Sequence, residues 1–196
     1  MYVLLYFAMY KFLILLTFIG TTLQAEGGQD IPTYVAKHKD LAISEMKRTG
    51  IPASIKLAQA ILESNHGTSE LATKANNHFG IKCGSNWNGM TYRKHDDDFK
   101  NGKLVKSCFR HFSSDIESFR AHSDLLANPK KKYRYGFLFK YDTKDYESWA
   151  YGLLDAGYAT DLSYPQKLIS LINKYELYQY DGGHRITAEP RISEYS

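Results

Sequence analysis

Apolar residues recur at the spacing of an α-helix through much of the chain after residue 30. The stretch 31–50 ends at a glycine, and the stretch 51–67 has Pro52 near its first turn and ends at another glycine. Proline is favoured in the first turn of a helix, and glycine often follows the last turn because it adopts the left-handed backbone found there. A shorter apolar stretch covers 69–75. The pattern predicts successive helices in this part of the chain.

The pattern changes between residues 83 and 112. Two runs of β-compatible residues flank Asn101 and Gly102, a pair that favours a tight hairpin turn because both residues tolerate positive φ. Cys83 and Cys108 stand near the outer ends of these runs. We expect a small β-lobe over 83–112 that is built on one hairpin.

Helical spacing returns after the hairpin, over 116–128, 144–157 and 164–178. The last stretch, 182–196, has no periodicity, and we expect a flexible tail there. The chain shows no internal repeat. We therefore expect a single domain over 26–181 of the α+β class that is mainly α, with helices around a β-hairpin insert.

The first 25 residues differ in character from the rest. Their one charged residue, Lys11, precedes the apolar run 12–20, and Ala25 follows a short polar segment. This is the organisation of a secretory signal peptide with a small residue at the cleavage site. We expect 1–25 to be removed after Ala25 and the protein to be exported to the periplasm or the cell exterior, with translation starting at Met1 or Met9. An uncleaved anchor is the alternative, although a membrane-spanning helix needs about 18 apolar residues or more.

Composition and charge narrow the class of protein. Of the 196 residues, 43% are hydrophobic and 23% are charged, which is typical of a globular protein. The net charge of +4 is compatible with an anionic cell-wall polymer as partner. The basic residues are dispersed, and we expect their one short cluster, 130–134, to be a solvated loop, so nucleic acid is not an expected partner. We expect a monomer.

Both cysteines, Cys83 and Cys108, fall in the part predicted to be exported. Thiols in an oxidising compartment tend to pair, so we expect a disulfide; two unrelated buried thiols are the alternative. Cys83 also begins a CGSNW sequence that partly matches a cysteine-protease signature, but a turn follows it instead of a helix and the chain is too short for the distant histidine. The seven histidines show no metal-ligand spacing, and we expect no metal or cofactor.

Glu63 is the first candidate for chemistry. It falls in the last turn of the predicted helix 51–67, at the border of the apolar face that Ile55, Ala58 and Ile61 define. Burial and the partial negative charge of a helix C-terminus both disfavour an ionised carboxylate, and a general acid near neutral pH requires this effect. A solvated surface glutamate is the alternative interpretation.

The hairpin offers further carboxylates in Asp96, Asp97 and Asp98. With a two-residue turn, Asp98 faces Val105, and strand alternation places Asp96 and Asp98 on one face and Asp97 on the other. Besides the acid, glycosidic cleavage usually needs a second carboxylate or a group of the substrate itself, which stabilises the positive charge that develops at the sugar carbon. Adjacent acids are also typical of a solvated strand edge. A calcium-binding loop is excluded because a lysine and a serine occupy positions that need ligands.

Three segments, 50–83, 108–126 and 156–181, carry motifs that occur together in one family. In this order they closely resemble the glucosaminidase domain of glycoside hydrolase family 73, the peptidoglycan β-N-acetylglucosaminidases. The resemblance covers 31–181. It implies a lysozyme-like, mainly helical fold whose cleft runs between the helices and the β-lobe. It also implies cleavage of the β-1,4 bond between N-acetylglucosamine and N-acetylmuramic acid in peptidoglycan glycan strands.

The resemblance also implies roles for individual residues. Glu63 matches the general acid of the LAQAxLES motif, and Tyr158 of the AGYATD motif matches a tyrosine of the active site. Judged from the residues alone, Tyr158 could equally be a core aromatic and Asn76 a helix cap. The ANNHFG stretch is implied to line the region beside the acid, through Asn76, Asn77, Phe79 and Gly80.

One position departs from the family pattern. Many members carry a glutamate ahead of the hairpin turn where this chain has Asp98, with Asp96 on the same expected face. Asp98 could activate water, or the substrate's own 2-acetamido group could act as the internal nucleophile. Two other functions stay open: a lytic transglycosylase or muramidase of lysozyme-like fold, and a non-catalytic peptidoglycan-binding module.

Overall fold

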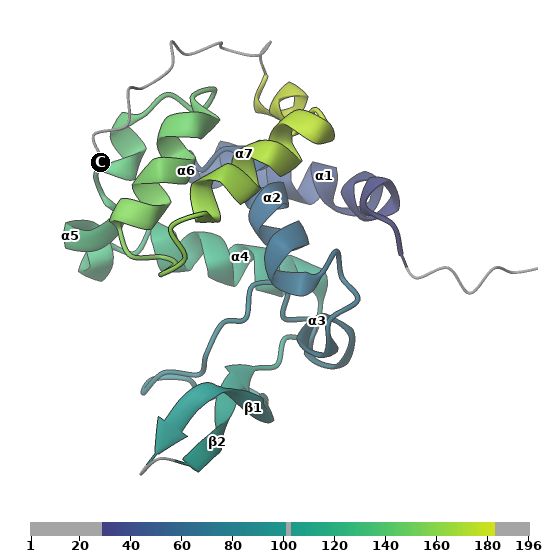
Figure 1. Cartoon of the computed structure of the whole chain (residues 1–196), viewed down its shortest axis with the longest axis vertical. Coiled ribbons are helices and arrows are strands. Elements are labelled where there is room, and N and C mark those ends of the chain that lie inside the picture. Colours follow the sequence, from purple (N-terminus) through teal and green to yellow (C-terminus); the bar gives the residue numbers. More distant parts are fainter. Residues whose placement is uncertain (1–28, 101–102, 183–196) are drawn as a thin grey trace, which may run out of the picture.

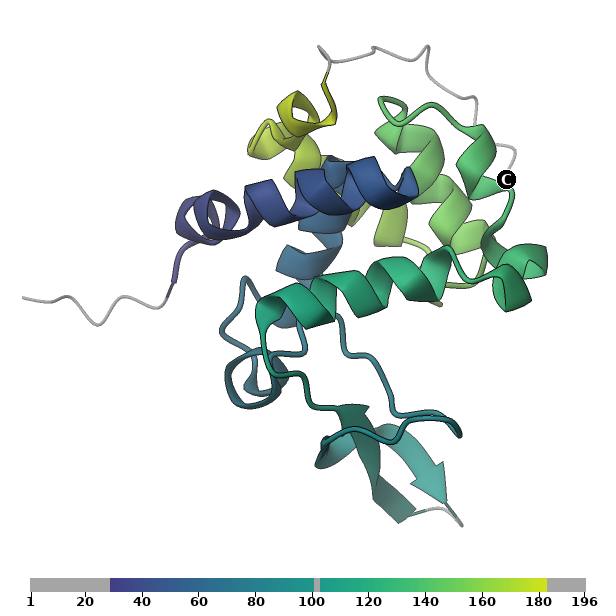
Figure 2. The ribbon, with the colours of Figure 1, turned by 180° about the vertical axis from the view of Figure 1, so that it is seen from behind.

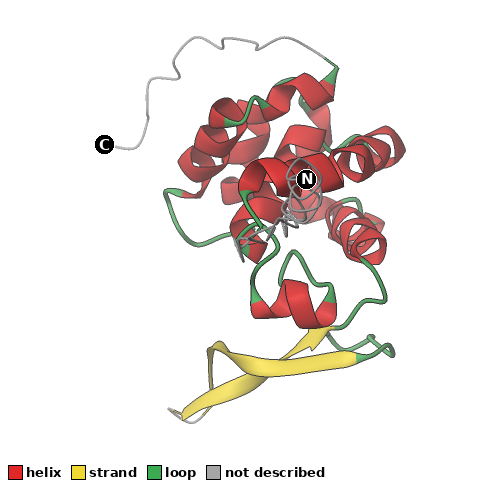
Figure 3. Cartoon of the chain, turned by 90° about the vertical axis from the view of Figure 1, so that its right-hand side faces the viewer, coloured by secondary structure: helices red, strands yellow, loops and turns green. Residues whose placement is uncertain are grey.

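The computed structural model describes residues 29–100 and 103–182. The helical body and the projecting hairpin (Figures 1 and 3) confirm the predicted fold class, α+β and mainly α. The predicted signal peptide, 1–25, and all but the first residue of the predicted tail lie outside the described residues. No helix among the described residues is long and apolar enough to cross a membrane. The elements in chain order are α1 (Ile31–Thr49), α2 (Ala53–Ser64), α3 (Glu70–Ala75), β1 (Thr91–Lys100), β2 (Lys103–Arg110), α4 (Asp115–Leu126), η1 (Pro129–Lys131), α5 (Lys132–Tyr135), η2 (Leu138–Lys140), α6 (Tyr146–Asp155), α7 (Tyr164–Lys174) and η3 (Leu177–Asp181).

Local signals explain where the first two helices begin and end. The Asp30 carboxylate accepts a hydrogen bond from the Thr33 backbone N–H at 2.8 Å and caps α1. Gly50 ends α1 with a φ of 82°, a left-handed conformation that glycine adopts without steric cost. Asn65 ends α2 with a φ of 49°. The last turn of α2 therefore carries Glu63, as the sequence predicts.

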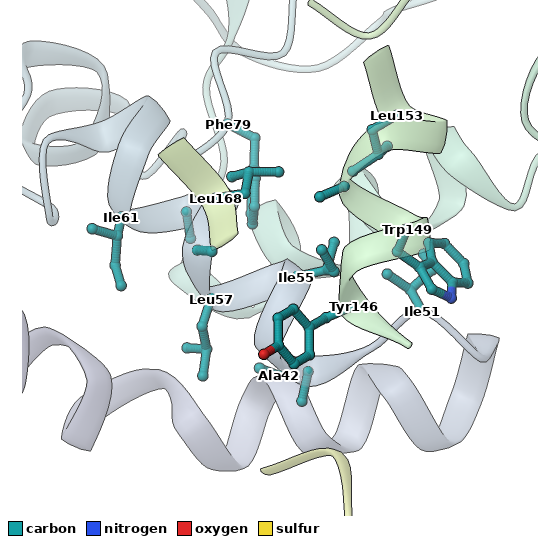
Figure 4. Close-up of a cluster of buried hydrophobic side chains, with 14 of the residues drawn as sticks. Ala42, Ile51, Ile55, Leu57, Ile61, Phe79, Tyr146, Trp149, Leu153 and Leu168 are labelled. Atoms are coloured by element: carbon teal, nitrogen blue, oxygen red, sulfur yellow. The ribbon is translucent and has the colours of Figure 1, made fainter. Parts of the chain in front are cut away.

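α2 is the central helix of the body. Every residue of 53–61 is buried, and α1, α6 and α7 pack around this helix (Figure 2). Figure 4 shows Ile55 and Leu57 of α2 in one apolar cluster with Trp149 of α6 and Leu168 of α7. Removing such surface from water stabilises the fold by about 25 cal/mol per Å². Because its neighbours enclose α2, this helix reaches solvent only in its last turn.

The basic segment 130–134 is exposed at residues 130, 132 and 133, as its sequence predicts, but it is helical and not a loop. It forms the end of η1 and most of α5, and Lys131 and Arg134 within it are half-buried. Tyr135 and Leu138, which follow it, are buried in the core. The prediction of a loop was wrong because these two apolar anchors hold the segment on the body, a tertiary contact that a run of lysines does not reveal.

β1 and β2 form an antiparallel hairpin, seen edge-on in Figure 3. The pairing runs regularly up to His95 and resumes at Phe99, which pairs with Leu104. Between these points the register shifts, and residues 96–98 of β1 stand opposite Val105 alone. Extra residues in one strand, here two, bend it and break the strict alternation of side chains.

A disulfide joins Cys83 to Cys108, which confirms the predicted pair. The Cys83 backbone N–H also donates to the Cys108 carbonyl oxygen at 2.9 Å, and the Arg110 N–H donates to the Ile81 carbonyl oxygen at 2.9 Å. These links tie the segment before the hairpin to the end of β2. Neither cysteine is free, so a thiol nucleophile is excluded.

Candidate active site

A cleft of about 900 Å³ lies between the helical body and the base of the β-lobe. Its walls come from the last turn of α2, the segment 79–84, the end of β2, the η1–α5 region, and the segment 158–161 with the first turns of α7. These segments are far apart in the sequence and meet only in the folded protein. The resemblance implies a cleft in this place.

Glu63 lies in this cleft. Its side chain is accessible to solvent, but the cleft walls displace part of its hydration, and this desolvation raises the pKa of the carboxyl above its usual value. The Tyr164 hydroxyl donates to Glu63 Oε1 at 3.0 Å and partly opposes the shift. The net direction is upward, so more of the carboxyl keeps its proton near neutral pH. An accessible carboxyl that holds a proton has what a general acid needs.

Two side chains that the sequence analysis did not single out hold Glu63 in place. Gln59 lies one turn before Glu63 on α2, and its Nε2 donates to the hydroxyl oxygen of Tyr164 at 3.1 Å. The Tyr164 hydroxyl proton is thereby directed to Glu63. The i, i+4 spacing of Gln59 and Glu63 is a signal that could have been used. No local signal links Tyr164 to α2, because it stands 101 residues after Glu63.

Tyr158 lines the cleft at the end of a chain of buried hydrogen bonds. Nζ of Lys56 lies 2.8 Å from Nδ1 of His122 and donates to Ser123 Oγ at 2.6 Å. Nε2 of His122 lies 3.1 Å from the Tyr158 hydroxyl oxygen. Lys56, His122 and Ser123 have no exposed surface. The chain from Lys56 through His122 to Tyr158, named the buried relay below, therefore meets solvent only at Tyr158.

The chemistry of the side chains assigns a direction to the buried relay. A protonated lysine amine can only donate, and a neutral one has two N–H groups, which suffice for Ser123 Oγ and for Nδ1 of His122. With Nδ1 as the acceptor, the imidazole proton sits on Nε2. Nε2–H then donates to the Tyr158 oxygen, and the Tyr158 hydroxyl proton is left to point into the cleft. Burial lowers the pKa of His122 well below its usual value and raises the pKa of Tyr158 well above its own, so both groups stay neutral. The Phe79 ring stacks on His122, with 4.0 Å between centroids.

The buried lysine should make the stability of the fold depend on pH. Burial lowers the pKa of Lys56 to about 7, from 10.5 for an ordinary lysine. Between these values the unfolded chain holds the proton and the folded chain does not, so the free energy of unfolding should rise by about 1 kcal/mol per pH unit. Lys56→Met is expected to flatten this rise. Urea unfolding at about pH 7, 8 and 9 measures how the free energy of unfolding changes with pH in the wild type and in the variant. The same change in both proteins would contradict a lowered pKa of Lys56.

The ANNHFG stretch divides between the cleft and its support. Phe79 and Gly80 line the cleft, as the resemblance implies. Asn76 ends α3 in a left-handed conformation, and its side chain donates to the Phe112 carbonyl oxygen at 3.0 Å. Asn77 is buried, and its amide bonds to backbone groups at the base of the lobe. Neither asparagine belongs to the cleft lining; both fasten the lobe to the body beneath it.

The predicted second carboxylates belong to β1. Asp96 and Asp98 fall where the register with β2 shifts, and their side chains lie outside what the structure describes. The expectation that they share a face rests on unbroken alternation, and the shift removes that support. Their part in the reaction stays a prediction.

One cluster has the composition of a metal site, which the sequence spacing did not reveal. Nε2 of His38 and Nε2 of His78 lie 3.1 and 3.0 Å from the two carboxylate oxygens of Asp115, and the ligand atoms of the three residues lie within 4.8 Å of one another. Nζ of Lys37 also lies 2.8 Å from Asp115. These hydrogen bonds, those of the histidines first, hold the pKa of Asp115 far below its usual range. With a lysine already present as the cation, we interpret the cluster as an ionic link between α1 and α4.

Comparison with known proteins identifies the family. The Glucosaminidase family model, described as mannosyl-glycoprotein endo-beta-N-acetylglucosaminidase, matches residues 39–177, which is more than half of the chain. The chain belongs to the glucosaminidase family of glycoside hydrolases. The match contains the whole site described above: Lys56, Gln59, Glu63, His122, Tyr158 and Tyr164.

Curated relatives of this glucosaminidase are longer proteins. It is 39% identical over 134 residues to the exo-glucosaminidase LytG of Bacillus subtilis, and the aligned region covers 65% of this chain and 45% of LytG. It is 35% identical over 135 residues to the peptidoglycan hydrolase FlgJ of Escherichia coli K12, and the aligned region covers 65% of this chain and 41% of FlgJ. The chain thus spans less than half the length of these relatives.

Solved structures confirm the glucosaminidase fold. The catalytic domain of the autolysin Auto from Listeria monocytogenes matches with a TM-score of 0.67 and 30% identity, covering 77% of this chain and 87% of that one. A glycoside hydrolase domain of FlgJ from Salmonella typhimurium matches with a TM-score of 0.61 and 30% identity, covering 75% and 98%. The arrangement of helices with a small β-lobe is therefore that of the family.

Proposed function

We propose that this glucosaminidase hydrolyses the β-1,4 bond between N-acetylglucosamine and N-acetylmuramic acid in peptidoglycan. The observation that carries the proposal is Glu63, a carboxyl in the cleft whose pKa is raised and whose Oε1 accepts from Tyr164. Relatives that are named glucosaminidases and peptidoglycan hydrolases support this class of substrate. The basic cleft, described below, suits a polymer that carries acidic groups.

Glu63 is the general acid in this reaction. Since Oε1 accepts from Tyr164, the transferable proton is on Oε2. The proton goes to the glycosidic oxygen while the bond from that oxygen to the anomeric carbon breaks, and the bonding electron pair leaves with the oxygen. Positive charge then develops on the sugar. The Tyr164 hydroxyl stabilises the Glu63 carboxylate that remains.

Two groups can meet the positive charge on the anomeric carbon. The carbonyl oxygen of the substrate's 2-acetamido group can bond to that carbon and form a cyclic intermediate, which water then opens, or Asp98 can activate the water directly. In both routes the water oxygen ends on the anomeric carbon. In the acetamido route the Glu63 carboxylate takes one water proton and is restored directly. In the Asp98 route Asp98 takes that proton, and proton exchange with solvent afterwards restores both carboxyl groups. Tyr158, whose hydroxyl proton points into the cleft, is placed to donate to a substrate oxygen.

Mass spectrometry of fragments from digested peptidoglycan tests the bond that is cleaved. N-acetylglucosamine at the new reducing ends is the expected result. Muramic acid at the reducing ends would instead indicate a muramidase, fragments without a reducing end a lytic transglycosylase, and binding without release a non-catalytic module. Release of single N-acetylglucosamine residues in place of oligomers would indicate exo action, which the name of LytG describes.

The lobe carboxylates are tested by single substitutions. Asp98→Asn is expected to slow hydrolysis by about tenfold or more, because a positioned carboxylate that activates water or orients the acetamido group contributes at least this much. Asp96→Asn is expected to slow it less. Asp97→Asn is measured beside them, because the register shift removes the strand alternation that would set Asp97 apart. Glu147→Gln, on α6 and outside the cleft lining, is the control and is expected to keep turnover. Full activity of Asp98→Asn on the same peptidoglycan preparation would remove the lobe from the chemistry.

We propose, further, that the enzyme acts outside the cytoplasm as a monomer. The signal-like segment 1–25 and the disulfide between Cys83 and Cys108 support export, because disulfides persist in oxidising compartments. The mature enzyme is then the domain 26–181 followed by its tail. Mass spectrometry of the exported protein is expected to give an N-terminus at residue 26, and a retained segment 1–25 would contradict cleavage.

A further inference from the structure

Positive charge gathers in the cleft that holds Glu63. Lys167 and Asp161 form an ion pair at 2.6 Å and cancel each other. Glu63 has a raised pKa and carries less negative charge than an ordinary carboxyl. The basic side chains of the lining are Lys82, Arg110, Lys131, Arg134 and Lys167, and its acids are Glu63 and Asp161. The cleft lining therefore carries more positive than negative charge near neutral pH.

Arg110, Lys131 and Arg134, named the cationic subsite here, come from the end of β2, from η1 and from α5. All are half-buried. The Arg110 guanidinium lies over the Trp87 ring, 4.6 Å from its centroid, and its buried Nε makes no hydrogen bond within the part of the chain that the structure describes. Arg134 donates to two backbone carbonyls at the end of α6, one of them at 2.7 Å. The contacts of both guanidinium groups are with neutral partners.

The cationic subsite has no counter-ion among the side chains that the structure describes, which are those of 29–95, 103 and 105–182. No carboxylate of these residues forms an ion pair with any of its members. Burial, followed by the positive charges of Arg134 and Arg110, lowers the pKa of Lys131, and burial lowers the pKa of Arg110. The three charges disfavour one another, so an anion placed among them would be attracted by all three.

We propose that Arg110, Lys131 and Arg134 bind carboxylate groups of the substrate, an inference that rests on the proposed function. The sugar rings of peptidoglycan are uncharged. Its carboxylates belong to the lactyl group of muramic acid where no peptide is attached, or to acidic residues of an attached peptide. Guanidinium groups bind carboxylates through paired hydrogen bonds, and Lys131 adds a mobile ammonium.

The geometry also prepares the guanidinium groups for this role. Trp87 and the carbonyls at the end of α6 restrict Arg110 and Arg134 before any ligand arrives. Ordering a long side chain on binding costs about 0.5–1.5 kcal/mol, and a side chain that is already ordered avoids most of that cost. Lys131 is the member to mutate, because its removal disturbs no hydrogen bond that supports the fold.

Binding measurements test the cationic subsite without depending on turnover. Proteins that carry Glu63→Gln, to prevent hydrolysis, are titrated calorimetrically with three soluble ligands: glycan strands with peptides, strands from which an amidase has removed the peptides, and neutral N-acetylglucosamine oligomers. Adding Lys131→Gln is expected to lower the ratio of affinity for acidic strands to affinity for neutral oligomers by about fivefold. Lys132→Gln removes the same charge from the next residue, which is exposed and outside the cleft lining, and is expected to keep the ratio.

The two sources of carboxylate give different results. A lower ratio for peptide-bearing strands alone assigns the carboxylate to the peptide, and a lower ratio for stripped strands alone assigns it to the lactyl group. Either result supports the subsite. An unchanged ratio in Lys131→Gln, an equal change in Lys132→Gln, or no binding of either acidic strand would overturn it. Failure of the proposed function is seen separately, as the absence of fragments when the wild-type protein is incubated with peptidoglycan.

Discussion

Replacing Glu63 by glutamine is expected to lower the release of reducing ends from peptidoglycan by about a hundredfold or more. Glutamine keeps the shape of the side chain and can still accept from Tyr164, whose hydroxyl lies 3.0 Å from Oε1, but its amide has no acidic proton to give to the glycosidic oxygen. Proton transfer occurs only in the transition state, so the loss should fall on kcat and leave KM nearly the same. A reducing-sugar assay with purified peptidoglycan measures both constants.

Glu147→Gln is the matched control for this experiment, since Glu147 lies on α6 outside the cleft lining. Both variants should keep the helical circular dichroism of the wild type. The pH profile provides a further check. Glu63 must be protonated to act, so wild-type activity should fall as the pH rises through its raised pKa, and any residual activity of Glu63→Gln should lack this limb. Wild-type turnover in Glu63→Gln would remove Glu63 from the chemistry.

Replacing Tyr158 by phenylalanine is expected to lower kcat by about ten- to a hundredfold. The substitution removes the hydroxyl that the buried relay directs into the cleft. It keeps the ring that packs near Tyr164, with 5.8 Å between centroids, and near His122. Tyr178→Phe, on η3 and outside the cleft lining, is the control and should retain activity. Undiminished kcat in Tyr158→Phe would assign Tyr158 to the core.

A combined substitution tests whether the buried relay orients Tyr158. Lys56→Met together with His122→Phe replaces both buried polar partners, which costs less stability than removing one and leaving the other unpaired. Phenylalanine can keep the stacking on Phe79. In this background Tyr158→Phe is expected to cost much less activity than it does in the wild type, because the hydroxyl is no longer directed. Additive losses would show that Tyr158 acts independently of Lys56 and His122.

The sequence by itself determined the hairpin, the candidate acid and six of the helices: α1, α2, α3, α4, α6 and α7. The signals responsible are local: Gly50 after α1, Asn101 and Gly102 between the strands, and the cysteine pair at the base of the lobe. Each acts on neighbouring backbone or on one chemical bond, so its effect can be anticipated without the rest of the fold. The place of Glu63 in the last turn of a helix followed from the same signals.

The same local signals failed where an anchor lies elsewhere in the fold. The lysine-rich segment 130–134 has the composition of a solvated loop, yet the burial of Tyr135 and Leu138 brings Lys131 and Arg134 to the cleft wall. The register of β1 shifts at its run of aspartates, which strand alternation alone does not anticipate. Packing against remote residues decides both features.

Only the tertiary structure decided the surroundings of Glu63, the proposed acid, and of Tyr158. Tyr164, the partner of Glu63, lies 101 residues after it in the sequence. Lys56 contacts His122, which lies 66 residues after Lys56. From the sequence, the polar residues of α2 would be placed at the surface, but its neighbours enclose residues 53–61 on all sides, so Lys56 is buried. The pKa of an acid and the direction of a hydrogen bond depend on which groups surround it within a few ångströms. Those neighbours come from distant segments, which is why the sequence could name the acid but not its environment.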